Sequence, residues 1–189
     1  MAEQSGSEMS LTTSRRKFLI QSSASILVAT CSPLAFASTN KIAEKSLSFL
    51  HLHTHESLNC CYWKDGQYDT LALKQINHLL RDHRTDEVAP IDIELLEMLS
   101  KLHSATQSNA PFEIISGYRS AKTNQQLRNS TSGVAKRSYH MQGKAIDVRL
   151  ADVDLKKLRN EAISLQAGGV GYYQKSGFLH LDTGRPRNW

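Results

Sequence analysis

Cysteine is scarce in this chain of 189 residues, which contains only Cys31, Cys60 and Cys61. A disulfide framework needs several separated pairs of cysteines, and a bond between the neighbours Cys60 and Cys61 would be strained. The sequence therefore excludes the class of small secreted domains that disulfides hold together. The chain is instead long enough for one compact domain with a hydrophobic core of its own, plus a short appendage.

Long apolar runs are also missing, and the most apolar stretch near the N-terminus follows two arginines. It reads SRRKFLIQSSASILVATCSPLAFA (residues 14–37) and ends in a small-residue cleavage site. Its apolar part is too short and too rich in Ser and Gln to span a bilayer as a stable helix. The arginine pair favours a twin-arginine export signal over a disordered basic tail. We therefore expect residues 1–37 to be a signal peptide and residues 38–189 to be a periplasmic domain without a transmembrane segment.

Internal repeats and low-complexity linkers are absent from residues 38–189, which favours a single domain. Alternating or short apolar runs predict strands. Leucines at helical spacing predict helices that begin near residues 69–70, 90–92 and 152–154, where Asp side chains can cap them. Because the helices precede and interrupt the strands, we expect an α+β fold with a small antiparallel sheet packed against helices. The predicted strands lie at residues 47–55, 61–64, 112–115, 145–150, 168–173 and 177–182.

Acidic residues are nearly absent from residues 119–149, where Asp147 is accompanied by seven Lys and Arg residues. The chain as a whole is only mildly basic, with a formal net charge of +5. A basic stripe of this kind indicates an anionic partner, although a solvated surface loop would have the same composition. The predicted export argues against nucleic acid. We therefore expect contact with peptide carboxylates of the cell envelope and no binding of nucleic acid.

Two of the predicted strands carry titratable residues in alternation with apolar ones. Asp147 lies in the strand at residues 145–150, and His180 and Asp182 lie in the strand at residues 177–182. If these strands pair in one sheet, their apolar rows face the helices and the titratable residues share the open face. Gly143 gives the preceding loop the backbone freedom to fold back, so that His140 can reach the same face.

Two imidazoles and one carboxylate from separate segments form a donor set that Zn²⁺ accepts in catalytic sites. Such sites use three protein ligands and leave one position for a water molecule, whose pKa the metal lowers to about 7. His140, Asp147 and His180 are therefore candidate metal ligands. Spacing alone gives equal weight to a plain ion pair between His140 and Asp147 with His180 merely hydrogen-bonded.

A family resemblance strengthens the metal interpretation. The stretch SYHMQGKAIDVRL (residues 138–150) matches the S-x-H-x-x-G-x-A-x-D signature of the zinc D-Ala-D-Ala peptidases, which have the Hedgehog/DD-peptidase fold. The likeness extends through ISGYRS, GVAKRSYH, GGVGYY and FLHLDTG to Trp189 and, with the leader, resembles the periplasmic murein endopeptidases of that family. The resemblance implies that His140, Asp147 and His180 bind zinc. It also implies that Arg119 steadies the developing oxyanion, a task suited to a fixed guanidinium.

One position departs from the pattern of the family. In the dipeptidase branch a glutamate three residues before the last histidine ligand acts as general base, and this chain has Gly177 there. Asp182 is our candidate base in its place, and the alternative is that it supports a metal ligand. Tyr139, next to His140, and Arg119 are candidates for contact with the substrate.

These observations favour a zinc-dependent murein endopeptidase. The resemblance implies that it cleaves cross-links at meso-diaminopimelate in peptidoglycan stem peptides, and we expect a monomer. Two alternatives stay open. A D-alanyl-D-alanine carboxypeptidase would have the same residue spacing, and the missing glutamate would suit a non-catalytic, zinc-containing protein that binds peptidoglycan.

Overall fold

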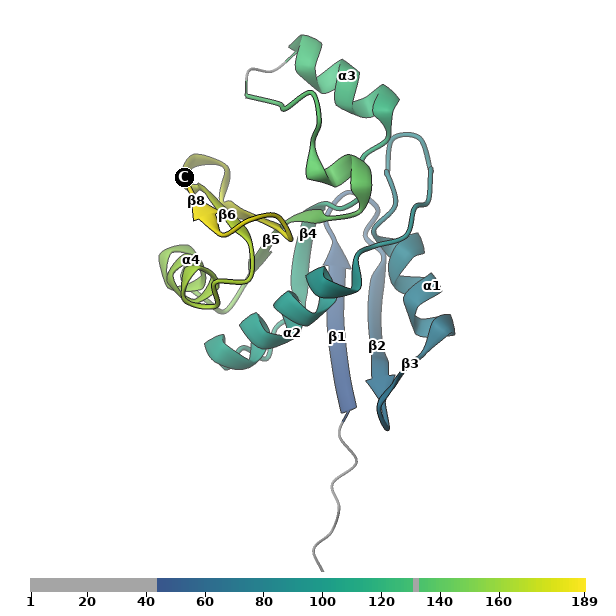
Figure 1. The fold of residues 1–189 in the computed structure, drawn as a ribbon, viewed down its shortest axis with the longest axis vertical. Helices are drawn as coiled ribbons and strands as arrows, with labels where there is room; N and C mark the ends of the chain where they lie inside the picture. The colour runs from purple at the N-terminus through teal and green to yellow at the C-terminus, as the bar shows by residue number, and fades with distance from the viewer. Residues whose placement is uncertain (1–43, 131–132) are drawn as a thin grey trace, which may run out of the picture. The chain divides into compact units, whose positions relative to one another are not determined.

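The computed structural model of the protein describes residues 44–130 and 133–189, so the predicted signal peptide and its cleavage point lie outside the described residues. The described residues form an α+β domain, as the sequence predicts, around one eight-stranded sheet (Figure 1). The strands follow the order β3-β2-β1-β4-β5-β7-β6-β8 across the sheet. They are β1 (Glu44–His51), β2 (Ser57–Lys64), β3 (Gln67–Tyr68), β4 (Phe112–Ser116), β5 (Ala145–Leu150), β6 (Gly169–Tyr173), β7 (Phe178–Asp182) and β8 (Arg187–Asn188).

The helices begin where the sequence places capping carboxylates. Asp69 and Asp154 each accept hydrogen bonds from two backbone amides of the turn that follows, and Asp92 accepts one, which satisfies donors that the helix itself leaves unpaired. The α-helices are α1 (Thr70–Leu79), α2 (Ile93–Thr106), α3 (Ala121–Ser130) and α4 (Leu155–Ser164), and the short 3₁₀ helices are η1 (Tyr139–Gln142) and η2 (Gln174–Ser176).

The sheet is larger than expected and mixed, so the prediction of a small antiparallel sheet was wrong. β1 runs parallel to β4, with Phe49 opposite Phe112, and β6 runs parallel to β8, with Gly169 opposite Arg187. The remaining neighbouring strands are antiparallel. The chain leaves β1 through its hairpin partner β2 and returns to the other edge of β1 only after α1 and α2. A long crossover of this kind permits parallel pairing, which a tight turn cannot.

The two faces of the sheet have different chemistry at β5 and β7. Ile146 and Val148 of β5 and Leu179 and Leu181 of β7 are fully buried in the hydrophobic core, to which α2 and α4 contribute. The side chains between them project from the opposite face of the sheet. On that face Asp147 of β5 lies directly opposite His180 of β7. The predicted alternation in these two strands is confirmed. Within the described part of the chain, no helix combines the length and the hydrophobicity that a membrane span requires.

Candidate metal centre

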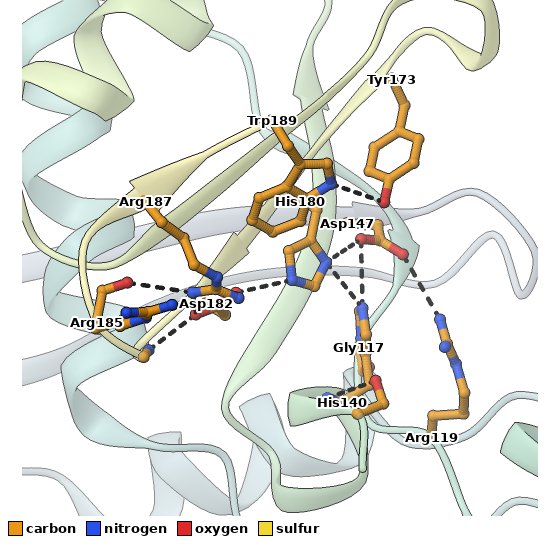
Figure 2. A network of polar contacts seen from close by, with 12 residues as sticks. Gly117, Arg119, His140, Asp147, Tyr173, His180, Asp182, Arg185, Arg187 and Trp189 are labelled. Carbon is orange, nitrogen blue, oxygen red and sulfur yellow. Dashed lines mark hydrogen bonds and ion pairs between the residues drawn. The ribbon is translucent and has the colours of Figure 1, made fainter. Parts of the chain in front are cut away.

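The three candidate metal ligands meet at one point on the open face of the sheet (Figure 2). His140 comes from η1, Asp147 from β5 and His180 from β7. Nδ1 of His180 lies 2.9 Å from Oδ1 of Asp147, and Nε2 of His140 lies 3.2 Å from Nδ1 of His180 and 3.3 Å from Oδ1 of Asp147. The convergence expected from strand alternation and from the loop at Gly143 is therefore present in the structure.

Glycine is required at position 143 for two reasons. Its φ of 65° lies in the left-handed region, where a side chain would be strained. A Cβ atom there would also lie only 2.1 Å from the carbonyl oxygen of Pro90. The sharp reversal at Gly143 brings His140, which lies in η1 just before it, over β5.

Each imidazole has one ring nitrogen that points away from the cluster, called its outer nitrogen, and this nitrogen is hydrogen-bonded to an acceptor. Nδ1 of His140 donates to the carbonyl oxygen of Gly117 at 2.8 Å, and Nε2 of His180 donates to Oδ2 of Asp182 at 3.1 Å. Because a carbonyl or carboxylate oxygen can only accept, these partners favour the tautomers that carry a proton on the outer nitrogen. In the neutral form of both rings, the inner nitrogens then present lone pairs to one another and to Asp147. An arrangement of three converging acceptors fits a cation at its centre.

Electrostatics in the cluster agree with this arrangement. Burial would raise the pKa of Asp147, but the neighbouring His140 and His180 hold that pKa below its usual range. Burial would lower the pKa of His180, but the hydrogen bonds that its ring donates to Asp147 and Asp182 raise that pKa to about 9. Positive charge is thus favoured at this point. Among the described residues, no other group of His, Cys, Asp and Glu side chains has three donor atoms close enough to share one ion.

Asp182 contacts His180 on the side of the ring that faces away from His140 and Asp147. Its side chain is fully buried, and Oδ2 receives the hydrogen bond from His180. The guanidinium of Arg187 donates to both carboxylate oxygens, at 2.9 Å and 2.7 Å, and the amide of Gly184 donates to Oδ1 at 2.9 Å. Burial would raise the pKa of Asp182, but hydrogen bonds from His180 and Arg187 outweigh burial and lower it. The carboxylate is therefore ionised and has no oxygen free of a partner.

Arg119 lies on the other side of the cluster, in the loop between β4 and α3. Its Nη2 lies 3.8 Å from Oδ2 of Asp147 and donates to Oγ of Ser116 at 3.4 Å. The side chain is only 12% exposed, and Nε has no hydrogen-bond partner among the described residues. Burial lowers the pKa of Arg119 from its usual value, and Asp147 opposes that change. The Nη2 end of a buried guanidinium thus faces Asp147 in the candidate metal site.

A cleft of about 530 Å³ opens over these residues, and aromatic side chains form part of its wall. Nε1 of Trp189 donates to the hydroxyl of Tyr173 at 3.2 Å, and the indole lies 5.5 Å from the ring of His180 (Figure 2). Strand alternation indicates that only one of Tyr172 and Tyr173 can face the cleft. The cleft is lined by Arg119, Gly133, Val134, Ala135, Arg137, Ser138, Tyr139, His140, Asp147, Tyr173, Ser176, Phe178, His180, Arg187 and Trp189.

Some of the site residues predicted from the sequence line the cleft, and others do not. Tyr139 and Arg119, the candidates for substrate contact, both line the cleft, whereas Asp182 and Gly177 do not. Asp147 is the only acidic side chain among the lining residues. The contact between Arg187 and Asp182 was missed from the sequence, because the irregular residues 183–186 separate the two strands and carry no periodicity that could indicate a contact.

Comparison with known proteins gives a consistent result. The M15 peptidase family model described as "Peptidoglycan L,D-endopeptidase MepK" matches residues 39–189. The protein of that name from Escherichia coli (strain K12) is 38% identical over 175 residues, which cover 93% of this chain and 96% of that protein, and its Shigella flexneri counterpart gives the same values. The "Probable peptidoglycan L,D-endopeptidase MepK" of Haemophilus influenzae is 42% identical over 159 residues, or 84% of each chain. No solved structure matches significantly.

Proposed function

The chain belongs to the family of the MepK peptidoglycan L,D-endopeptidases, a family of metallopeptidases, and from that premise we propose that it hydrolyses peptide cross-links of peptidoglycan with the aid of zinc. The observation that carries the proposal is the convergence of His140, Asp147 and His180 beside Arg119 in an open cleft. Two histidines and one carboxylate form the donor set of catalytic rather than structural zinc sites. We further propose a Hedgehog/DD-peptidase fold and a preference for cross-links at meso-diaminopimelate, as the sequence motifs imply.

One group of residues in the cleft would bind the metal, and another group contacts the substrate. His140, Asp147 and His180 would hold Zn²⁺, which supplies an activated water and polarises the scissile carbonyl. Arg119 donates hydrogen bonds to the amide oxygen as negative charge develops on it, and the low exposure of its side chain strengthens that interaction. Tyr139 contacts the substrate peptide, together with the aromatic wall formed by Tyr173 and Trp189.

Cationic residues near the cleft suit the carboxylates of stem peptides. Arg137 lines the cleft, and the exposed Lys136 precedes it in the chain. Positive potential around a cleft attracts anionic substrates and increases their rate of association. The proposed substrate lies outside the cytoplasm, so we also propose that the leader at residues 1–37 directs twin-arginine export to the periplasm, where the protein acts as a monomer.

Cleavage of defined muropeptides tests the function directly. The purified protein is incubated with cross-linked dimers and with pentapeptide monomers, before and after treatment with a chelator. We expect dimers to be converted to monomers, chelator to stop the conversion, and added Zn²⁺ to restore it. Release of D-alanine from pentapeptides without loss of dimers would instead identify a carboxypeptidase. Intact dimers that nevertheless bind the protein would identify a non-catalytic binding protein.

We propose that Asp182 positions His180 and does not act as the general base. This assignment is supported by the burial of Asp182 and by the hydrogen bonds that occupy both of its oxygens. Asp182→Asn is expected to weaken zinc binding by about 10- to 100-fold, the usual effect of losing a partner of a ligating histidine. Activity should return when zinc is raised to saturation. Competition with a chromogenic chelator gives the affinity, and a zinc titration of cleavage gives the activity.

The matched control for Asp182→Asn is Asp152→Asn. Asp152 is an exposed carboxylate that accepts hydrogen bonds from Ser108 and Asn109 away from the cleft, and its loss should leave zinc affinity unchanged. If Asp182→Asn bound zinc normally but stayed inactive at saturating zinc, the base assignment would be correct and the positioning role would be wrong.

A further inference from the structure

The loop that carries Arg119 is fixed by three consecutive backbone amides, each paired with a different acceptor. The amide of Tyr118 donates to the carbonyl oxygen of Leu80 at 2.7 Å, and the amide of Arg119 donates to that of His140 at 3.1 Å. The amide of Ser120 donates to Oδ2 of Asp82 at 2.9 Å. Two of these three acceptors belong to the main chain. Asp82 is the one that a single substitution can remove.

Asp82 is itself held rigidly. Its side chain is 1% exposed, and its second oxygen, Oδ1, accepts the amide of Arg84 at 3.0 Å. Its main chain closes a tight loop, because its amide donates to the carbonyl oxygen of Glu87 at 3.0 Å and its own carbonyl accepts the amide of Asp86 at 2.8 Å. A second contact joins the same two loops, since the hydroxyl of Tyr118 donates to Oε1 of Glu87 at 2.7 Å.

The charge of Asp82 is stabilised where it lies. Burial would raise the pKa of its carboxyl group, but the nearby hydroxyl groups of Ser120 and Thr123 and the backbone amides of Ser120 and Arg84 outweigh burial and lower that pKa to about 2. Asp82 is therefore ionised at every pH at which a periplasmic enzyme would act. A buried carboxylate that accepts hydrogen bonds from amides on two sides anchors the Arg119 loop strongly. Hydrogen bonds to charged groups are stronger than those between neutral groups.

We propose that Asp82 is a positioning residue for Arg119. It fixes Ser120 immediately after Arg119, while Leu80 fixes Tyr118 immediately before it, so both neighbours of the arginine are attached to the segment that follows α1. The inference rests on the proposed role of Arg119 in the peptidase reaction. A displacement of about 1 Å in a group that contacts the reacting atoms can reduce a rate by about 100-fold.

The metal ligands have anchors that do not include Asp82. The ring of His140 donates to the carbonyl oxygen of Gly117 and its amide donates to Oγ of Ser138, and His180 donates to Asp182. Asp147 is fixed within β5 in the middle of the sheet. Loss of Asp82 should therefore disturb the position of Arg119 while the metal stays bound.

The substitution Asp82→Asn tests the proposal with little change in volume. Asparagine has one acceptor oxygen where aspartate has two, so its NH₂ group would face the amide of either Ser120 or Arg84. We expect kcat on muropeptide dimers to fall by about 10- to 100-fold, with KM within about threefold and bound zinc unchanged. In an Arg119→Ala background the same substitution should reduce kcat no further, because residues that act as one unit are not additive.

The matched control is Asp154→Asn at the N-terminus of α4. Asp154 also accepts two backbone amides, from Lys156 and Lys157, both at 3.0 Å, but it has no contact with the loop of Arg119. The control should keep the kcat of the unmodified protein. If Asp82→Asn matched this control, or reduced kcat equally with and without Arg119, the proposal would be wrong.

Hydrogen exchange separates failure of this inference from failure of the proposed function. If the unmodified protein left muropeptide dimers intact, the proposed function would be wrong, and the amides of residues 118–120 would decide the remaining question. Faster exchange of these amides in Asp82→Asn than in Asp154→Asn would support the anchoring role. Equal exchange in the two variants would overturn it.

Discussion

Replacing His140 by alanine is expected to remove bound zinc and to reduce kcat/KM on muropeptide dimers by on the order of 10³-fold or more, equivalent to about 4 kcal/mol of transition-state stabilisation. His140 supplies one of only three protein donors, and its ring is aimed by the hydrogen bond from Nδ1 to Gly117. Without it, Asp147 and His180 retain their direct contact at 2.9 Å, which satisfies them without a metal. Metal analysis and steady-state kinetics on the same preparation measure both effects.

The control for His140→Ala is another histidine bound to a main-chain carbonyl. His103 contacts the carbonyl oxygen of Ala110 through Nε2 at 3.0 Å and lies outside the cleft. His103→Ala should therefore keep both zinc and activity. A His140→Ala protein that retained one zinc per chain and normal turnover would contradict the proposed metal centre.

Replacing Arg119 by alanine is expected to lower kcat by about 10²- to 10³-fold while zinc stays bound, which is the usual cost of removing one donor to an oxyanion. The guanidinium faces Asp147 but is not one of the three converging donors, so the metal does not depend on it. Arg119→Lys should recover only part of the rate, because an ammonium group lacks the planar arrangement of donors. Single-turnover cleavage of dimers, together with zinc analysis, gives both quantities.

Arg149→Ala is the matched control for Arg119. Arg149 lies on β5, two residues after Asp147, and pairs with Glu113, and it does not line the cleft. Its loss should change kcat by less than about twofold, as expected for a substitution that removes only a partly exposed ion pair. If both arginine variants lost the same activity, the effect would reflect general charge rather than a hydrogen bond to the reacting oxygen.

The convergence of the three candidate ligands could be predicted in part because it follows from local rules. In a strand the side chains alternate between faces, so Asp147 and His180 had to share a face once β5 and β7 were paired. The position of His140 followed from a glycine whose backbone can reverse the chain sharply. The pairing of β5 with β7 was an assumption of that prediction, and the family resemblance rather than the spacing favoured a metal over an ion pair.

The parts that could not be predicted depend on contacts between segments far apart in the sequence. The parallel pairing of β1 with β4 is set by how two intervening helices cross the sheet, and neither strand carries a signal for it. Asp82 resembles any polar loop residue in the sequence, and its importance becomes visible only because Ser120 folds against it. For Asp182, both candidate roles were named from the sequence, but only its contacts with Arg187 and Gly184 favour one of them.

The acceptors that secure Tyr118 and Ser120 lie at positions 80 and 82, well before the ligand-bearing stretch that runs from His140 to His180. The segment that secures the Arg119 loop therefore belongs to the earlier half of the domain, whereas the three candidate ligands belong to the later half. The proposed hydrolysis would then require both halves of the domain.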